Sequence, residues 1–192
     1  SKKEAILRID PNSLDTLLHP TLDEKSSINV IANGLPASPG AASGKVVFTS
    51  EEAERLTGMM QDTILVRIET SPEDIQGMHA AKGILTARGG MTSHAAVVAR
   101  GMGRPCVSGS SEIVINYENK TFKTSSVEIK EGEIITIDGS TGRIILGSVA
   151  TIKPEISGDF SKLMSWSDSY RKMNIRTNSE TPNHTKIAKD FG

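Results

Sequence analysis

The chain has 192 residues, and its 22 lysines and arginines almost balance 23 aspartates and glutamates, which gives a formal net charge of −1. That balance excludes the strongly basic surface of a nucleic-acid-binding or anionic-membrane-binding protein. Apolar residues make up 36% and charged residues 23% of the sequence, a composition typical of a folded globular protein. At about 150 residues per domain, one domain accounts for most of the length, and we expect the remainder at the two ends.

A single cysteine, Cys106, excludes an intrachain disulfide, and no cysteines and histidines stand at zinc-ligand spacing. A reducing compartment, the cytoplasm, and the absence of a metal site are therefore expected. No apolar run approaches the roughly 20 residues of a membrane span, and the N-terminal sequence lacks the apolar stretch of a signal peptide. The first residue is serine rather than methionine, so we expect the chain to be part of a longer protein.

The first third of the chain is predicted to change from linker to domain at residue 34. Residues 1–33 mix short apolar pairs with turn residues, which is typical of an N-terminal linker. Residues 34–44 are rich in glycine, alanine, serine and proline and are predicted as a loop. The first strand is expected over residues 45–48. The elements expected next are a helix over 51–60 with Ser50 as its cap, a strand over 63–68, a helix from Ser71 to about 81, and a strand over 83–87.

The second half is predicted to be a helix followed by short strands. The alanine-rich stretch from Thr92 to Arg100 favours a helix that Gly101 ends. Strands are expected over 106–108, 113–115, 127–130, 134–138 and 143–146. Residues 34–153 thus form the predicted α/β domain. Apolar residues at three- and four-residue spacing after Pro154 predict an amphipathic helix, and Thr181 with Pro182 predicts a second helix start, so residues 154–192 are interpreted as a C-terminal linker and the start of a further domain.

The segment with the clearest chemical content is GGMTSHAAVVARG, which runs from Gly89 to Gly101. A glycine pair followed by Thr-Ser-His and a helix places His94 in the first helical turn, with Thr92 or Ser93 as the cap. Backbone N–H groups there have no intrahelical partner, and the helix dipole is positive. An anion carried on the His94 ring would therefore find donors.

These features predict that His94 is a phosphoryl relay, because a neutral imidazole is a good nucleophile near neutral pH. The hydroxyl groups of Thr92 and Ser93 are candidate donors to phosphate oxygens, and the turn at Gly89 and Gly90 would let a bulky partner approach. Two flanking arginines, Arg88 and Arg100, are candidates to steady phosphate charge. The alternative is that His94 is only a packed helical residue, and the residues alone leave both interpretations open.

Other reactive side chains are assigned structural roles. We expect His79 to pack within its helix, His19 and His184 to be solvated, and Cys106 to be a buried thiol. The segment from Gly40 to Lys45 lacks the spacing of a phosphate loop, residues from Gly101 to Cys106 lack the third glycine of a dinucleotide fingerprint, and no Gly-x-Ser-x-Gly nucleophile motif occurs. The sequence therefore signals no nucleotide site.

The chain resembles the central phosphohistidine domain of the pyruvate, phosphate dikinase family, within the phosphoenolpyruvate-utilising enzymes. The stretches that carry the resemblance are GGMTSHAAVVARGMGRPCVSG from Gly89, LPASPGAASGKVVF from Leu35, ETSPEDIQGMHAAKGILTARGG from Glu69, DGSTGR from Asp138, and IRTNSETP from Ile175. Phosphoenolpyruvate synthase and enzyme I of the sugar phosphotransferase system share the Gly-Gly-x-Thr-x-His pattern. Met91, where both usually have arginine, and Ser93, where the synthase often has cysteine, favour the dikinase family.

This resemblance implies a swivelling domain of the β/β/α type with partly helical linkers at both ends. It implies that His94 is phosphorylated from ATP and inorganic phosphate at an N-terminal nucleotide-binding domain and discharged to pyruvate in a C-terminal barrel. Magnesium and ATP would be bound outside this chain, whose parent is expected to be a homodimer. The family also implies regulatory phosphorylation of Thr92 by a bifunctional kinase and phosphatase. A non-catalytic docking module is the alternative from a different functional class.

Overall fold

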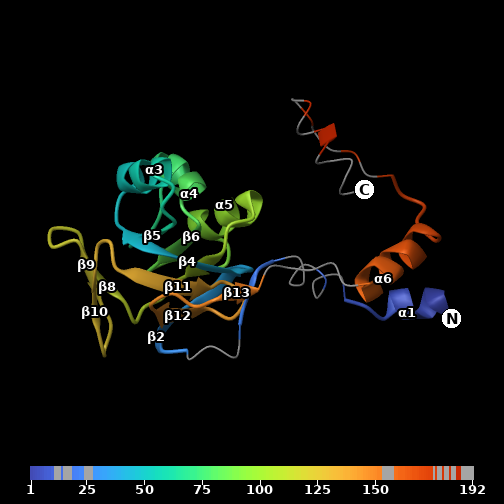
Figure 1. Ribbon diagram of the computed structural model, residues 1–192, viewed down its shortest axis with the longest axis horizontal. Coiled ribbons are helices and arrows are strands. Elements are labelled where there is room, and N and C mark those ends of the chain that lie inside the picture. Colours follow the sequence, from blue (N-terminus) through green and yellow to red (C-terminus); the bar gives the residue numbers. More distant parts are fainter. Residues whose placement is uncertain are drawn as a thin grey trace. The chain divides into compact units, whose positions relative to one another are not determined.

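The computed structural model describes residues 1–10, 14, 19–23, 28–152 and 158–174, together with positions 176, 179, 182, 185 and 186. The chain divides into two compact units (Figure 1), one formed by Ser1–Asp10 with Ile156–Gly192 and the other by Pro11–Glu155. In the described part of the chain, no helix has the length and apolar character that crossing a membrane requires.

The larger unit is built on an eight-stranded mixed sheet. In sheet order its strands are β2 (Val30–Asn33), β12 (Arg143–Leu146), β11 (Ile134–Asp138), β4 (Ala41–Val47), β5 (Thr63–Arg67), β6 (Gly83–Thr86), β7 (Cys106–Ser108) and β3 (Leu35–Ser38). Strands β4 to β7 run parallel, and the outer strands pair antiparallel. Side chains of successive residues alternate between the two faces, so each face carries its own apolar core.

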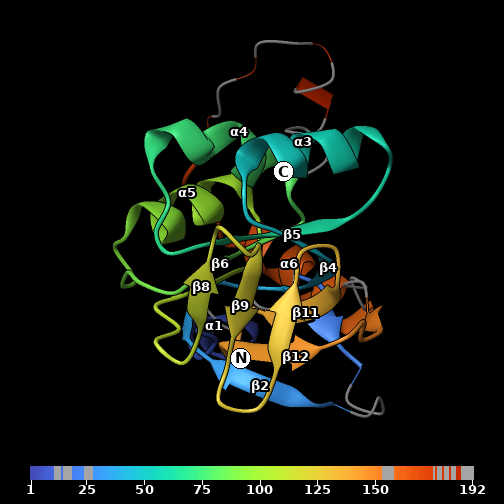
Figure 2. The ribbon, with the colours of Figure 1, turned by 90° about the vertical axis from the view of Figure 1, so that its left-hand side faces the viewer.

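Helices cover one face of this sheet (Figure 2). They are α3 (Ser50–Gly58), the short 3₁₀ helix η1 (Pro72–Asp74), α4 (Ile75–Ala80) and α5 (His94–Met102). The alanines of α5, Ala95, Ala96 and Ala99, recur at helical spacing and pack in one cluster with Leu65 and Ile84 of the sheet. Small side chains there let the helix backbone approach the strands closely, which fixes the position of its first turn.

A three-stranded antiparallel sheet covers the opposite face. Its strands are β8 (Val114–Asn116), β9 (Thr121–Lys123) and β10 (Glu128–Lys130), with β9 in the middle. Phe122 and Ile129 pack in a second cluster with Ile64, Val66 and other apolar residues of the large sheet. The unit therefore has three layers, a small sheet, a large sheet and helices, which confirms the predicted α/β fold of the β/β/α type.

The compact unit begins earlier than the predicted boundary at residue 34. Thr21–Leu22 (β1) pairs antiparallel with Thr151–Ile152 (β13), and β2 is an outer strand of the large sheet. Leu22 and Ile31 are buried. The interpretation of residues 1–33 as a linker is therefore wrong for β1 and β2, because their apolar side chains complete the core.

The smaller unit joins helices from the two ends of the chain. Helix α1 (Lys2–Leu7) is capped by Ser1 in a capping box with Glu4, and α6 is Gly158–Asp168. The ammonium of Lys2 lies 5.4 Å from the ring centroid of Trp166, a cation–π contact between them. An amphipathic helix was expected after Pro154, and α6 forms there, although none of its residues is buried. The helix start predicted at Thr181 lies outside the described residues.

Several predicted elements need correction. Residues 34–44, expected as a loop, contain β3 and the first half of β4, whose small residues are buried against neighbouring strands. Strand β9 was not predicted. Thr49 rather than Ser50 caps α3, since the Thr49 hydroxyl accepts from the N–H of Glu52 at 3.3 Å. Helix α5 extends to Met102 and ends at Gly103, whose φ of 63° is left-handed.

Cys106 is predicted to make the fold less stable in alkali. Burial raises the pKa of its thiol to about 12, whereas an unfolded cysteine titrates near 8.5. The folded state therefore keeps a proton that the unfolded state loses, so this contribution is complete below pH ~8.5 and is lost as the pH rises towards 12. At pH 10 the loss is about 2 kcal/mol. Urea unfolding of the native chain at pH 7.5 and pH 10 should show this decrease in the free energy of unfolding.

The Cys106→Ala variant isolates the thiol, because every other titrating group is common to both proteins. Its free energy of unfolding should be lower at neutral pH, since a buried thiol packs in the helix-side core. It should nevertheless fall less than that of the native chain between the two pH values. Equal pH slopes in the two proteins would contradict the prediction.

Candidate active site

The candidate site lies at the edge of the large sheet where the parallel strands end. The segment after β5 carries Thr70, the turn after β6 carries Gly89, and β7 itself ends at Ser108. The turn after β6 leads directly into α5, so the first turn of the helix stands at the same edge. The carboxyl ends of parallel strands are the usual place for a functional site in such folds.

His94 is the first residue of α5 and thus lies in the first helical turn, where it was predicted. Of the two candidate caps, Ser93 takes the position, because its hydroxyl accepts from the backbone N–H of Ala96 at 3.4 Å. Helix α5 has nine residues, and its first turn directs backbone N–H groups and the positive end of its dipole towards the site. The His94 side chain is half-buried, so part of the ring can still be reached from outside.

A threonine that the sequence interpretation did not single out fixes the ring of His94. Nδ1 of His94 lies 3.0 Å from the hydroxyl oxygen of Thr70, which is a buried residue. A ring nitrogen within this distance of a hydroxyl is hydrogen-bonded, and the protonation of the ring decides the donor. The bond restricts the ring to an orientation in which Nε2 is the nitrogen left for chemistry.

Two glycines shape the turn that precedes His94. Gly89 has a φ of 111°, and a Cβ there would stand 2.8 Å from that of Ser93 and 3.1 Å from the hydroxyl of Ser108. Gly109, with a φ of 63°, approaches the carbonyl of Gly89 so closely that a side chain would collide with it. Both positions therefore need glycine for conformation and for space.

A chain of hydroxyl groups supports the helix cap. The Ser93 hydroxyl lies 3.3 Å from that of Ser108, which in turn accepts from the hydroxyl of Thr86 at 3.1 Å. Thr86 and Ser108 are both fully buried. The Ser93 hydroxyl is thus engaged in the cap and in this chain, which favours a structural role over direct donation to an anion.

The other predicted site residues differ in whether their side chains are free to bind a ligand. Thr92, Arg88 and Gly90 are exposed near His94, and within the described ranges the Arg88 guanidinium makes no ion pair. Arg100, by contrast, donates from Nε to the carbonyl of Ala96 at 3.1 Å and from Nη2 to the carbonyl of Met91. Its guanidinium is therefore committed to holding the turn onto the helix, whereas that of Arg88 is available.

Two further histidines that the structure describes, His79 and His19, lie away from this edge. His79, expected to pack, is exposed near the end of α4, where its carbonyl accepts from Arg104 at 2.9 Å. His19, expected to be solvated, is half-buried, and His184 lies outside the described residues. Cys106 is buried, as expected. Among the residues that the structure describes, no three histidines, cysteines or acids come together to hold a metal ion.

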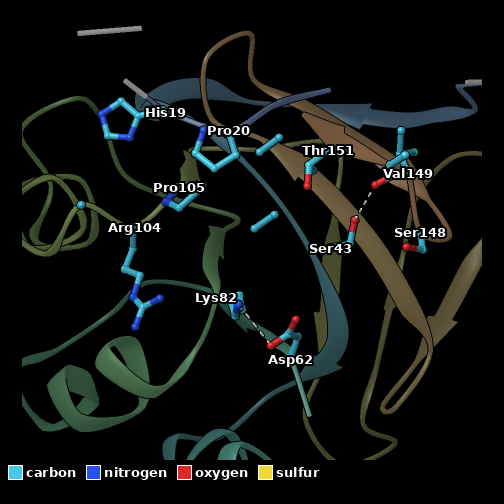
Figure 3. A pocket seen from close by; sticks show the side chains of 14 residues that line it. His19, Pro20, Ser43, Asp62, Lys82, Arg104, Pro105, Ser148, Val149 and Thr151 are labelled. Carbon is cyan, nitrogen blue, oxygen red and sulfur yellow. Dashed lines mark hydrogen bonds and ion pairs between the residues drawn. The ribbon is translucent and has the colours of Figure 1, made fainter. Parts of the chain in front are cut away.

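A cavity of about 520 Å³ lies at the opposite edge, where the parallel strands begin (Figure 3). Its charged lining is locally paired: Lys82 lies 3.4 Å from Asp62, and Arg104 donates to the carbonyl of His79. Helices α4 and α5 end beside it, and their dipoles are negative there.

Thr70 could have been found from the sequence by its position. It stands three residues after the end of the buried parallel strand β5, as Gly89 stands three residues after the end of β6, and residues in these places share one edge of the sheet. The prediction that Ser71, Pro72 and Asp74 begin a helix is confirmed.

The comparisons with known proteins agree with this geometry. Residues 59–142, which include the site, match the family described as "PEP-utilising enzyme, mobile domain". Over its whole length the chain is 56% identical to a pyruvate, phosphate dikinase of Rhizobium meliloti, 53% to one of Clostridium symbiosum, and 50% to the chloroplastic pyruvate, phosphate dikinase 1 of Arabidopsis thaliana. It spans 21%, 22% and 20% of these three proteins, respectively.

The chain thus corresponds to about a fifth of each relative. The match to the family model and the full-chain similarity agree with each other, and the layered α/β fold is consistent with both. Residues 59–142 therefore match the mobile domain of the PEP-utilising enzymes, within a chain that is similar over its whole length to pyruvate, phosphate dikinases.

Proposed function

We propose that this chain is the phosphoryl-carrier segment of a pyruvate, phosphate dikinase and that Nε2 of His94 is the phosphoryl acceptor. The observation that carries the proposal is the bond of 3.0 Å between Nδ1 of His94 and the Thr70 hydroxyl. With Nδ1–H donating to Thr70, the lone pair is on Nε2, where a nucleophile needs it. The start of α5 places the positive end of the helix dipole beside the developing phosphate charge.

Exposed groups around the ring fit the role of phosphate support. We propose that Arg88 pairs with phosphate oxygens, since its guanidinium is exposed and makes no ion pair within the described residues. The Thr92 hydroxyl is a second donor. Gly89 and Gly90 carry no side chains that would block the approach of a phosphate-bearing group. The space beside Gly90 is open, since an added methyl group there would meet nothing within 4 Å.

The reaction we propose has three transfers in the parent enzyme. A pyrophosphoryl group passes from ATP to His94 with release of AMP, the outer phosphoryl group leaves on inorganic phosphate as pyrophosphate, and the remaining phosphoryl group passes to pyruvate to give phosphoenolpyruvate. Each transfer is reversible. ATP, magnesium and pyruvate would be held by other domains, and this chain's own groups orient the imidazole and stabilise charge.

A carrier that serves two sites has to move between them, and we propose that the two ends of the chain are its tethers. The proposed partners are an N-terminal nucleotide-binding domain and a C-terminal barrel of the same enzyme, which we propose to be a cytoplasmic homodimer. Residues 154–192 would form the C-terminal tether and the start of the barrel. The N-terminal tether would be shorter than residues 1–33, because β1 and β2 belong to the compact unit.

The test combines the chain with a dikinase nucleotide-binding domain, magnesium, ATP and inorganic phosphate, followed by intact mass spectrometry. We expect one added phosphoryl group that is lost in acid, and peptide mapping should place it on His94. Failure to label, while the same segment of an authentic dikinase is labelled in parallel, would reject the proposal. Labelling from phosphoenolpyruvate alone, with onward transfer to a small phosphocarrier protein, would indicate enzyme I instead.

We also propose that Thr92 is a regulatory phosphorylation site. It is exposed and stands two residues before His94. A phosphate there would add up to about two negative charges next to the ring and repel the incoming phosphoryl group. Incubation with a bifunctional regulatory kinase and peptide mass spectrometry tests this, and an unmodified Thr92 would rule it out.

A further inference from the structure

The position of Thr70 is not set by a helix or a strand. It lies in the segment between β5 and η1, yet its hydroxyl stands 3.0 Å from Nδ1 of His94. A hydrogen bond of this kind is sensitive to displacements of a few tenths of an ångström. Whatever holds the two ends of the segment Ile68–Asp74 therefore also holds the ring of His94.

The first end of this segment is held from the small sheet. The backbone N–H of Ile68 donates to the Tyr117 hydroxyl at 2.9 Å, and Tyr117 follows directly on β8. The Arg67 guanidinium lies 5.3 Å from the Tyr117 ring centroid, and Phe48 meets the same ring edge-on at 6.4 Å between centroids. These ring contacts orient the tyrosine so that its hydroxyl meets the start of the segment.

The second end is held by Asp74, a carboxylate only 4% exposed. Oδ2 accepts from the backbone N–H of Ser71 at 2.9 Å, and Oδ1 accepts from the Ser50 hydroxyl at 3.0 Å. Nε of Arg67 lies 3.3 Å from Oδ1, an ion pair that is not aligned as a hydrogen bond. A buried carboxylate with this many partners has one position, and it fixes the residue directly after Thr70.

We propose that Asp74 and Tyr117 are positioning residues for His94. They hold the Ile68–Asp74 segment from both ends, so that the Thr70 hydroxyl accepts from Nδ1–H and keeps Nε2 unprotonated. The part of the proposal that concerns phosphoryl acceptance rests on the proposed function. The part that concerns the imidazole tautomer stands on the geometry alone.

The test is nitrogen NMR of the full chain labelled with ¹⁵N, recorded where the imidazoles are neutral. The sequence has four histidines, and the signals of His94 are assigned by their loss in His94→Asn. In the native chain we expect the tautomer protonated at Nδ1 to dominate. In Asp74→Asn the ratio of this tautomer to the other should fall about threefold to tenfold, the effect of losing one ordinary hydrogen bond. Thr70→Val should give the same fall, and combining the two should add little.

Asp138→Asn is the matched control. Asp138 is 5% exposed, pairs with Nη2 of Arg143 at 2.9 Å, and accepts from the backbone N–H of Ser140 at 3.0 Å. It thus resembles Asp74 in burial, charge partner and turn-holding, but it lies on β11, away from the segment that carries Thr70. Both variants should lose thermal stability, whereas only Asp74→Asn should change the tautomer ratio of His94. An equal ratio in the two variants would overturn the proposal.

Tyr117→Phe keeps the question answerable if Asp74→Asn does not fold. It removes only the hydroxyl and keeps the ring contacts with Arg67 and Phe48, and Tyr170→Phe, in the smaller unit, serves as its control. A shift of the His94 tautomer in Tyr117→Phe alone supports the proposal, and no shift overturns it. A native chain that shows the tautomer but never takes a phosphoryl group would refute the proposed function and leave this inference standing.

Discussion

Replacing His94 by asparagine is expected to abolish phosphoryl labelling of the chain and to leave its fold intact. Asparagine has no nitrogen nucleophile, because the amide lone pair is delocalised. It can still form a hydrogen bond with Thr70, whose hydroxyl stands 3.0 Å from Nδ1 in the native chain. The His94 ring is only half-buried, so the free energy of unfolding should change by less than about 1 kcal/mol.

His79→Asn supplies the control for this prediction, because His79 is an exposed histidine on a neighbouring helix of the same unit. Intact mass spectrometry should show the acid-labile adduct on the native chain and on His79→Asn, and none on His94→Asn. Circular dichroism and urea unfolding should give closely similar curves for the three proteins. Undiminished labelling of His94→Asn would contradict the assignment of the acceptor.

Much of the helical layer could be predicted from the sequence because its signals are local. The Ser71-Pro72 start and the glycine pair before His94 each act within a few residues of the element they bound. The end of α5 was placed at Gly101, two residues before the left-handed Gly103 that ends it. The strands 106–108, 134–138 and 143–146 were also predicted with the bounds that the structure has. Isoleucine is the commonest residue of β11 and β12, and β-branched residues are enriched in strands.

What the sequence could not supply depends on contacts between distant residues. The segment LPASPGAASG has small residues and prolines that are poor local signals for a strand, but it fills the space beside β7 and β11. The bond of Thr70 is similar: the position of Thr70 at the sheet edge could be read from the sequence, but its bond to a residue 24 positions later could not. The hydrogen bond from Ile68 to Tyr117 joins the large sheet to the small sheet. No spacing pattern in the sequence predicts such a contact.

The small sheet also depends on contacts between distant residues. Phe122→Ala, in its middle strand, should therefore lower the free energy of unfolding by about 3–5 kcal/mol. Phe122 is fully buried in the middle strand β9 and stands between Ile115 and Ile129 on the neighbouring strands. This row packs against the large sheet, so truncation leaves a cavity between two layers. A loss of that size is a large part of the 5–15 kcal/mol that usually stabilises a domain.

Val114→Ala, on β8 of the same sheet, is the control, because Val114 is 69% exposed and its truncation should change stability by less than about 0.5 kcal/mol. Urea unfolding measures both variants, and a loss below about 1 kcal/mol for Phe122→Ala would contradict the assigned packing. Weaker packing of the small sheet should also displace Tyr117, which follows β8 of that sheet. Its hydroxyl accepts from the backbone N–H of Ile68, so the segment that carries Thr70 should be affected as well. Under conditions where Phe122→Ala remains folded, its His94 tautomer ratio should therefore move in the same direction as that of Tyr117→Phe, while that of Val114→Ala stays native.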